Sequence, residues 1–203
     1  MTRIIELIFD LAAPNGYLAY YPLKAIAQRT GTDLEVIPVF LGGMHKLTGN
    51  APPMLRDAEI KGKVAYAELE FRRFLDLHGM DAFSMHPALP FNSILVQRVL
   101  TAAQNQRELQ ALVETLLPAV WEANIDCGDA DAVRRVLEEG GHDADRLLAA
   151  TQDPAVKQRL ADNTELSVER GAFGIPTMFV GEEMWFGKER LGQIEAYLTG
   201  GKP

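Results

Sequence analysis

Apolar residues dominate the first eleven positions of the chain, and the pattern then changes abruptly. The nearly continuous apolar run over residues 2–11 predicts a buried β-strand. From residue 17 to residue 27 the apolar positions follow helical spacing, and Pro14 suits the first turn of a helix, where its missing N–H is not needed. Alternating residues over 33–41 predict a second strand. Two strands joined by a single helix indicate a parallel β-α-β unit.

The middle of the chain predicts mostly helices. Residues 42–56 contain three glycines and two prolines, which indicate a loop. From about Asp57 an apolar face at helical spacing continues to His78, and a second loop covers residues 79–90. The residues after this loop are divided into separate helices by aspartate or asparagine at the expected N-caps. Pro118 should kink or end one of these helices. Later helices are expected from Asn92-Ser93 to Leu100, over Leu109–Val120, from Asp129 to Gly140, after Asp143 and from Asp153 to Gly171.

The last thirty or so residues return to a strand pattern. Gly174–Val180 and Met184–Phe186 flank a tight turn and predict a β-hairpin, and a final helix follows Gly187. The element order is therefore β-α-β, a long helical segment, then β-β-α. This is the order of an α/β protein with a thioredoxin-like fold and a large all-helical insertion. We expect residues 1–41 and 172–203 to form the thioredoxin-like domain and residues 42–171 the helical insertion domain.

Composition narrows the class of protein. The 203 residues are 47% hydrophobic and 24% charged, as in a globular protein with a substantial core. A net charge of −8 argues against a nucleic-acid partner, because such proteins need a basic face. No apolar run is long enough for a membrane span, and no secretory signal is expected. The single cysteine, Cys127, excludes an intramolecular disulfide, so a cytoplasmic location is expected.

The junction at Ala13-Pro14-Asn15 is the first candidate site. A strand that runs straight into a helix places free helix N–H groups at the carboxyl end of the strand, where α/β sheets often bind ligands. These groups and the helix dipole lower the pKa of a bound thiol. The alternative is an ordinary strand-to-helix turn. No metal site is expected, because the four histidines share no ligand spacing and Cys127 adds none.

Short motifs in a consistent order cover nearly the whole chain: Phe9–Ala19, Thr48–Pro53, Lys63 with Tyr66, Pro90–Ser93, Ala119–Trp121, Gly174–Thr177 and Trp185–Leu191. Together they resemble the family of 2-hydroxychromene-2-carboxylate isomerases and kappa-class glutathione transferases. The resemblance implies a DsbA-like thioredoxin fold with a helical insertion, glutathione as cofactor and a homodimer.

One position departs from the family pattern. Where the family has a serine, whose hydroxyl is thought to hydrogen-bond the glutathione sulfur, this chain has Ala13. Asn15 and Tyr17 are then the nearest side-chain donors, so the resemblance places the catalytic position at Ala13 and Asn15. We expect weaker activation of the thiol than in a serine-bearing relative.

The resemblance also assigns glutathione-binding residues beside Pro14. Ile175-Pro176 would contain a cis-proline that turns the backbone of Ile175 toward a peptide-like ligand. The alternative is a proline at a strand edge. Lys188, Glu189 and Arg190 would recognise the γ-glutamyl end of glutathione, although the family has aspartate where this chain has Glu189. The alternative is a charged first turn of the last helix.

Five further residues are placed at the cleft by the resemblance. Asn50 and Lys63 would contact glutathione, and Asn92, Tyr17 and Trp185 would contact the substrate. Without the resemblance, Asn50 and Lys63 are solvated side chains, Asn92 is a helix cap and Trp185 belongs to the core or the cleft wall.

Three functions follow from these observations. The first is a glutathione-dependent isomerase, in which the thiol adds to an aromatic hydroxy-enone acid, a bond rotates and the thiol leaves. The second is a kappa-like glutathione transferase or peroxidase that acts on small electrophiles. The third is a non-catalytic binder of glutathione or another small molecule. A protein-disulfide oxidoreductase is excluded, because residues 10–17 contain no cysteine.

Overall fold

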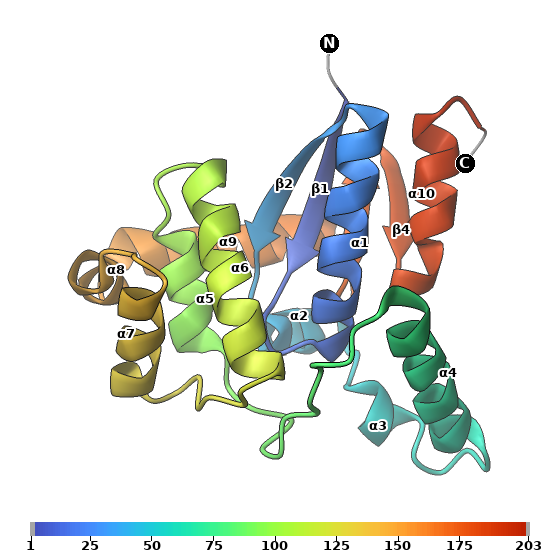
Figure 1. Ribbon diagram of the computed structural model, residues 1–203, viewed down its shortest axis with the longest axis horizontal. Coiled ribbons are helices and arrows are strands. Elements are labelled where there is room, and N and C mark those ends of the chain that lie inside the picture. Colours follow the sequence, from blue (N-terminus) through green and yellow to red (C-terminus); the bar gives the residue numbers. More distant parts are fainter. Residues whose placement is uncertain (1–2, 202–203) are drawn as a thin grey trace.

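The computed structural model describes residues 3–201 and consists of a mixed sheet covered by helices (Figure 1). In chain order the elements are β1 (Ile4–Phe9), α1 (Pro14–Thr30), β2 (Asp33–Pro38), α2 (Leu41–Thr48), α3 (Pro53–Arg56), α4 (Lys63–His78), α5 (Ile94–Thr101), α6 (Gln106–Trp121), α7 (Ala130–Glu139), α8 (Ala144–Ala150), α9 (Pro154–Glu169), β3 (Thr177–Val180), β4 (Glu183–Phe186), the 3-10 turn η1 (Lys188–Arg190) and α10 (Leu191–Leu198).

The sheet confirms the predicted topology. Its strand order is β2-β1-β3-β4. β1 and β2 are parallel, with Ile4 opposite Asp33, whereas β3 is antiparallel to both β1 and β4. In Figure 1, α1 and α10 lie in front of the sheet and α9 passes behind it. The β-α-β and β-β-α units thus share one sheet, which is the thioredoxin-like arrangement expected from the sequence.

One continuous apolar core joins the sheet to the inserted helices. Alternate residues of β1 (Ile5, Leu7 and Phe9) belong to the same buried cluster as Leu112 and Trp121 of α6. Burial of this kind is the main favourable term in folding. The division of the chain into two domains at residues 41/42 and 171/172 stays a prediction.

No helix within residues 3–201 is both long and apolar enough to cross a membrane.

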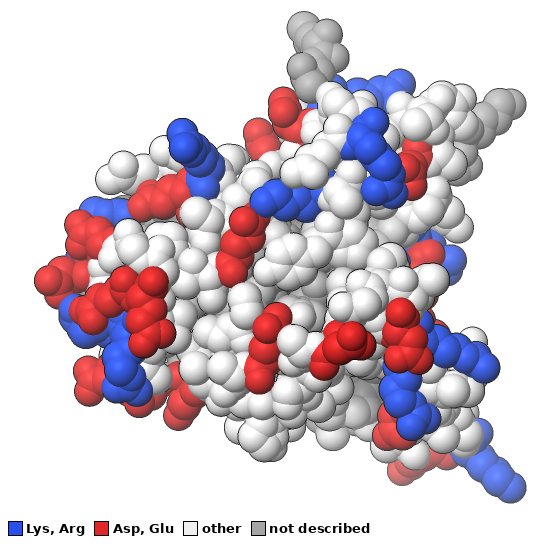
Figure 2. Space-filling view, viewed as in Figure 1, with Lys and Arg blue, Asp and Glu red and all other residues white. Residues whose placement is uncertain are grey.

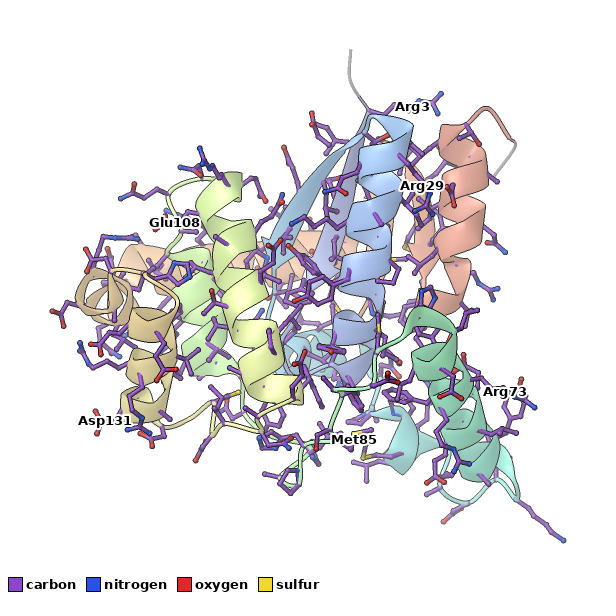
Figure 3. All side chains as sticks on the ribbon, in the orientation of Figure 1. Arg3, Arg29, Arg73, Met85, Glu108 and Asp131 are labelled. Atoms are coloured by element: carbon purple, nitrogen blue, oxygen red, sulfur yellow. The ribbon has the colours of Figure 1, made fainter. Side chains whose placement is uncertain are left out.

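One ion pair and one hydrogen bond hold the last helix in place. Arg29 of α1 points toward α10 and pairs with Glu195 (Figure 3). At the start of β1, Arg3 donates a hydrogen bond to the carbonyl oxygen of Tyr197 at 3.2 Å. Both contacts are exposed, so their contribution to stability is small and they mainly fix the position of α10.

The exposed edge of β2 is covered by glutamine side chains from α6. The amide of Gln106 accepts a hydrogen bond from Val36 N–H at 2.9 Å and donates one to Val36 C=O at 3.0 Å. One helical turn later, Gln110 donates to Leu34 C=O at 2.6 Å. These side chains pair with the strand in place of a neighbouring strand.

The predicted loop over residues 42–56 was wrong, because it contains helices α2 and α3. Leu41 also begins α2 rather than ending the second strand, which stops at Pro38. A Cβ on Gly42 would lie 2.9 Å from the ring of Phe40, and one on Gly43 would lie 3.2 Å from it. The glycines are therefore needed so that Phe40 can pack on the first turn of α2.

Other differences concern the ends of elements. β1 ends at Phe9, because the chain then forms a turn in which Ala13 N–H donates to Asp10 C=O. Thr2, the expected first residue of the strand, lies outside the described residues. The helix expected from Asp57 begins only at Lys63, after a left-handed Gly62. Pro118 lies within α6 and does not end it.

Most predicted helix caps are confirmed. The carboxylates of Asp129, Asp143 and Asp153 each accept a backbone N–H at the start of α7, α8 and α9. At α5, Asn92 precedes the N-cap residue Ser93, and its Oδ1 accepts Ile94 N–H at 2.9 Å. Ser93 does not cap this helix, because its hydroxyl donates to Asp10 at 3.0 Å.

The Asp10 carboxylate is fully buried and holds together the starts of three helices. Oδ1 accepts Ala12 N–H at 2.8 Å, and Oδ2 accepts Leu41 N–H at 2.7 Å and the hydroxyl of Ser93. The adjacent Gln97 amide donates to the carbonyl oxygens of Phe9 and Val39 and accepts Leu11 N–H. Burial raises the pKa of Asp10 to about 6, and its hydrogen bonds limit the rise.

This raised pKa predicts the pH dependence of stability. Because native Asp10 holds its proton more tightly than the unfolded chain does, its contribution to the unfolding free energy is full below about pH 4 and is lost as the pH rises through about 6. Relative to Asp10→Asn, the wild type should therefore gain about 2–3 kcal/mol between pH 7 and pH 4, as measured by urea unfolding.

Asparagine cannot accept all three hydrogen bonds, so the variant also loses stability at every pH. The diagnostic quantity is thus the slope of the difference, not its size. Asp81→Asn, which changes an exposed carboxylate, is the control. A flat difference for Asp10→Asn would contradict the prediction.

Candidate functional site

The start of α1 forms the floor of the site. Ala13 precedes the helix in extended conformation and has no side chain that could cap it. Its carbonyl oxygen accepts a hydrogen bond from Gly16 N–H at 2.8 Å, and its own N–H donates to Asp10 C=O. Within residues 3–201, Asn15 N–H meets no protein acceptor. The helix therefore presents a free donor and its positive end to a ligand.

Asn15 contributes an unsatisfied side chain at the same place. Its Oδ1 is buried and has no hydrogen-bond partner among the described residues. Buried polar atoms are nearly always paired, so an orphan at the end of a helix needs an explanation. A ligand that brings a thiol, hydroxyl or amide group would supply it. Asn15 thus has no evident structural function in the free protein.

The cis-proline loop lies against this helix start. The Ile175–Pro176 peptide bond is cis, as predicted. A Cβ on Gly16 would lie 3.5 Å from Ile175 Cγ2, and Ala13 and Ile175 belong to one apolar cluster. In the part of the chain that the structure describes, the N–H and C=O of Ile175 have no partner. An extended peptide-like ligand can therefore pair with this residue beside α1.

Asn50 is brought to the same loop from the end of α2. Its amide donates to Phe173 C=O at 2.7 Å and accepts Ala51 N–H at 2.9 Å. A Cβ on Gly174 would lie 3.7 Å from Asn50 Nδ2. Asn50 therefore braces the cis-proline loop, and in the free protein its hydrogen-bonding groups are largely occupied.

Lys63 is connected to Asn50 through two other side chains. Asp57 pairs with Lys63 at 3.0 Å and with Arg56 at 2.9 Å, and Arg56 reaches Asn50 Oδ1 at 3.4 Å. The hydrogen bonds from Arg56 and then Lys63 lower the pKa of Asp57. Lys63 is about half exposed and is the first residue of α4.

Lys188, Glu189 and Arg190 have different environments although they are consecutive. Lys188 is buried, and its ammonium pairs with Glu70 of α4 and with Glu189. Direct contact between Lys188 and a ligand would require both pairs to break. Arg190 is exposed and lines a hollow of about 400 Å³ with Gln193 and β4.

The three proposed substrate residues have different environments. Tyr17 donates from its hydroxyl to Glu122 at 2.9 Å and packs against Phe83, and burial followed by Glu122 raises its pKa. Asn92 is exposed at the start of α5. Trp185 is buried against Tyr197 in the core beneath α10, which fits the core alternative.

Sequence reasoning missed several residues that shape the site. Glu70 accepts a hydrogen bond from Lys188, and Glu122 accepts one from Tyr17. Asp10 and Gln97 fix the backbone around the starts of the helices. Only Asp10 carried a signal, since a carboxylate within an apolar run is costly unless it has partners. The other contacts join segments far apart in the sequence, which local periodicity does not reveal.

Neither metal chemistry nor a reactive cysteine is supported by the described residues. Within residues 3–201 no three His, Cys, Asp or Glu side chains gather as a metal site. Cys127 is buried, and burial, followed by Asp126 and Asp10, raises the pKa of its thiol to about 12. Lys and Arg alternate with Asp and Glu on the face shown in Figure 2, with no continuous basic field.

Comparison with known proteins agrees with this geometry. The DSBA-like thioredoxin domain model matches residues 4–199. The chain is 30% identical to a 2-hydroxychromene-2-carboxylate isomerase of Sphingobium xenophagum, over 98% of this chain and 99% of that protein. It is 27% identical to glutathione S-transferase kappa 1 of Homo sapiens, over 100% and 93% of the two chains.

A solved structure shows the same likeness in three dimensions. The structure of a 2-hydroxychromene-2-carboxylate isomerase superposes with a TM-score of 0.83, covering 97% of this chain and 94% of that one at 27% identity. The full-length match includes the helical insertion as well as the sheet. The chain therefore belongs to the DSBA-like thioredoxin-domain family, in the group of 2-hydroxychromene-2-carboxylate isomerases and kappa-class glutathione transferases.

Proposed function

We propose that the protein is a glutathione-dependent isomerase that acts on an aromatic hydroxy-enone acid, as its 2-hydroxychromene-2-carboxylate isomerase relatives suggest. The observation that carries the proposal is the pairing of an open helix start with the cis-proline loop. Among the residues that the structure describes, nothing pairs with Asn15 N–H or with the N–H and C=O of Ile175, which lie at adjacent points of the fold. A cysteinyl tripeptide needs such a combination, because its main chain and its sulfur must be held together.

Glutathione would supply a thiol that adds reversibly to a conjugated carbon and so allows the neighbouring bond to rotate. The task of the chain is then to orient the two reactants and to favour the charged sulfur. Asn15 and the positive end of α1 would stabilise the sulfur, and Ile175 would pair with the tripeptide main chain. Asn50 would hold the loop, and Lys63 with Asn92 would face carboxylate or hydroxyl groups at the rim.

A second candidate shares this site. A kappa-like glutathione transferase or peroxidase would use the same thiol on small electrophiles, and the similarity to glutathione S-transferase kappa 1 favours it. Turnover of an aromatic hydroxy-enone acid but not of an aryl halide would support the isomerase, and the reverse would support the transferase. A third possibility, a non-catalytic binder, predicts glutathione binding in calorimetry without turnover of either.

Ala13 suggests a direct gain-of-function test. Ala13→Ser restores a hydroxyl at the helix start, so the pKa of bound glutathione should fall by about one unit, and turnover near neutral pH should rise several-fold. The measurement is thiolate absorbance of bound glutathione against pH, together with the rate. Ala12→Ser changes the neighbouring residue and serves as control. An unchanged thiol pKa in Ala13→Ser would show that the missing hydroxyl at Ala13 does not weaken activation of the thiol.

Asn15 suggests a test that separates function from stability. Asn15→Ala removes the side-chain donor and the orphaned oxygen together, so glutathione affinity should fall about five- to tenfold, while the unfolding free energy stays equal or rises. Calorimetry and urea unfolding measure the two quantities.

A matched control for Asn15 is available at a helix cap. Asn105→Ala removes the cap of α6, whose Oδ1 accepts Glu108 N–H at 3.0 Å, and should lower stability by about 1 kcal/mol without changing glutathione affinity. If Asn15→Ala destabilised the protein and left affinity intact, the proposed role of Asn15 would be wrong.

The homodimer implied by the family remains part of the proposal. Helices α3 and α4 project from the body in Figure 1, where Arg73 of α4 points away from it in Figure 3. Large apolar side chains are exposed there, among them Leu55 at 63% and Ile60 at 52%. Exposed apolar side chains on a projecting segment commonly mark a protein interface, and a second copy of the chain would cover them.

This surface gives a test of the oligomeric state. The double substitution Leu55→Glu and Ile60→Glu should convert a dimer to a monomer in analytical ultracentrifugation, because buried unpaired carboxylates are costly. Leu166→Glu, at an exposed leucine of α9, is the control and should leave the dimer intact. A monomeric wild type, or a double variant that stays dimeric, would refute the assignment.

A further inference from the structure

The two edges of the sheet are protected differently. β2 forms one edge, and the amides of Gln106 and Gln110 pair with it. β4 forms the other edge and lies beside α10 in Figure 1. A hollow of about 400 Å³ lies against it, lined by all four residues of β4 together with Arg190 and Gln193. An uncovered strand edge is a template for pairing with another chain.

The register of the hairpin shows which main-chain groups of β4 are open. Gly187 N–H donates to Pro176 C=O at 3.0 Å, so the main chain of Gly187 faces β3. Along an antiparallel ladder, residues that bond to the neighbouring strand alternate with residues that do not. The N–H and C=O groups of Met184 and Phe186 therefore point away from β3. Within residues 3–201, no other segment bonds to them.

Apolar side chains border this open edge. Met184 is 38% exposed and Phe186 is 39% exposed, because both lie on the sheet face opposite Trp185, which is buried against Tyr197. Phe173 extends the apolar strip, since its ring centroid lies 4.5 Å from that of Phe186. A second strand alongside β4 with the same alternation would cover these side chains.

The charges at the two ends of β4 make the edge complementary to itself. Glu183 begins the strand, Arg190 follows its end in η1, and both line the hollow. When two copies of β4 pair antiparallel, Glu183 of each copy lies near Arg190 of the other. Parallel pairing would instead place Glu183 beside Glu183, which is unfavourable. A two-fold axis between the copies therefore satisfies both ends at once.

We propose that β4 pairs antiparallel with β4 of a second copy of the chain, so that two sheets join into one. The contact does not involve α3 or α4, so it is separate from the proposed dimer surface and would join one dimer to another. The covered edge of β2 keeps further strands from adding at the far side of each sheet. Because β4 has only four residues, the interface is small, and association should be reversible and appear above roughly 100 µM.

The first test is sedimentation velocity from about 5 µM to about 500 µM. It uses the wild type and the double variant Leu55→Glu and Ile60→Glu, in which the other proposed contact is removed. The mass of both proteins should rise reversibly with concentration, and that of the double variant should double and then stay constant. A mass that does not change with concentration in either protein would overturn the inference.

A proline substitution tests the main-chain pairing. Met184→Pro deletes an N–H that β3 does not use, so the fold should tolerate it, as checked by circular dichroism. The dissociation constant of the concentration-dependent step should rise about tenfold or more, because an edge proline blocks pairing with another strand. Unchanged association in a folded Met184→Pro protein would contradict the proposal.

Charge reversal provides a test without a proline. Glu183→Arg alone and Arg190→Glu alone should each weaken association about tenfold, and the two together should restore it to within about threefold of the starting protein. Glu165→Arg, which reverses an exposed charge on α9, is the matched control and should have no effect. If the combined reversal does not restore association, antiparallel pairing is refuted.

Hydrogen exchange locates the contact. The amide protons of Met184 and Phe186 should exchange quickly in dilute protein and slowly in concentrated protein, because pairing removes them from water. The amide proton of Trp185, which faces β3, should exchange slowly at both concentrations. Equal exchange of Met184 and Phe186 at both concentrations would show that any association uses another surface, and the inference would be wrong.

Discussion

The buried carboxylate of Asp10 is the constraint on which the site geometry depends. Two oxygen atoms receive donors from the turn before α1, from the start of α2 and from Ser93 before α5. The amide of Gln97 completes the arrangement by tying the ends of β1 and β2 together. A charged group in the core is costly, yet here it satisfies backbone donors that would otherwise be orphaned. The position of Ala13 and Asn15 follows from that network.

The sequence was sufficient for the architecture because the main signals are local. Alternation and helical spacing predicted the β-α-β unit and the hairpin, and aspartate caps predicted the starts of α7, α8 and α9. It was insufficient for α2, where glycine normally indicates a loop. There the helix is selected by the ring of Phe40 and by Asp10, which are tertiary contacts.

The site was predicted unevenly for the same reason. The helix start and the cis-proline loop are short motifs, and the structure places them side by side. The state of Lys188 could not be predicted, because its partner Glu70 is 118 residues away in the chain. Trp185 resembled a cleft residue in its motif but is enclosed by the packing of α10. Motifs thus located the backbone of the site better than the exposure of its side chains.

The glutamine cover on β2 has a consequence for how the protein behaves in crowded solution. An open strand edge is a template for intermolecular pairing, and a sheet with two open edges can grow in both directions. Gln106 already pairs with the N–H and C=O of Val36, and Gln110 with the C=O of Leu34. Stacking of copies into an extended sheet is therefore disfavoured at this end, where the two amides act together with the charged Asp33 and Glu35 and with Pro38 of the same strand.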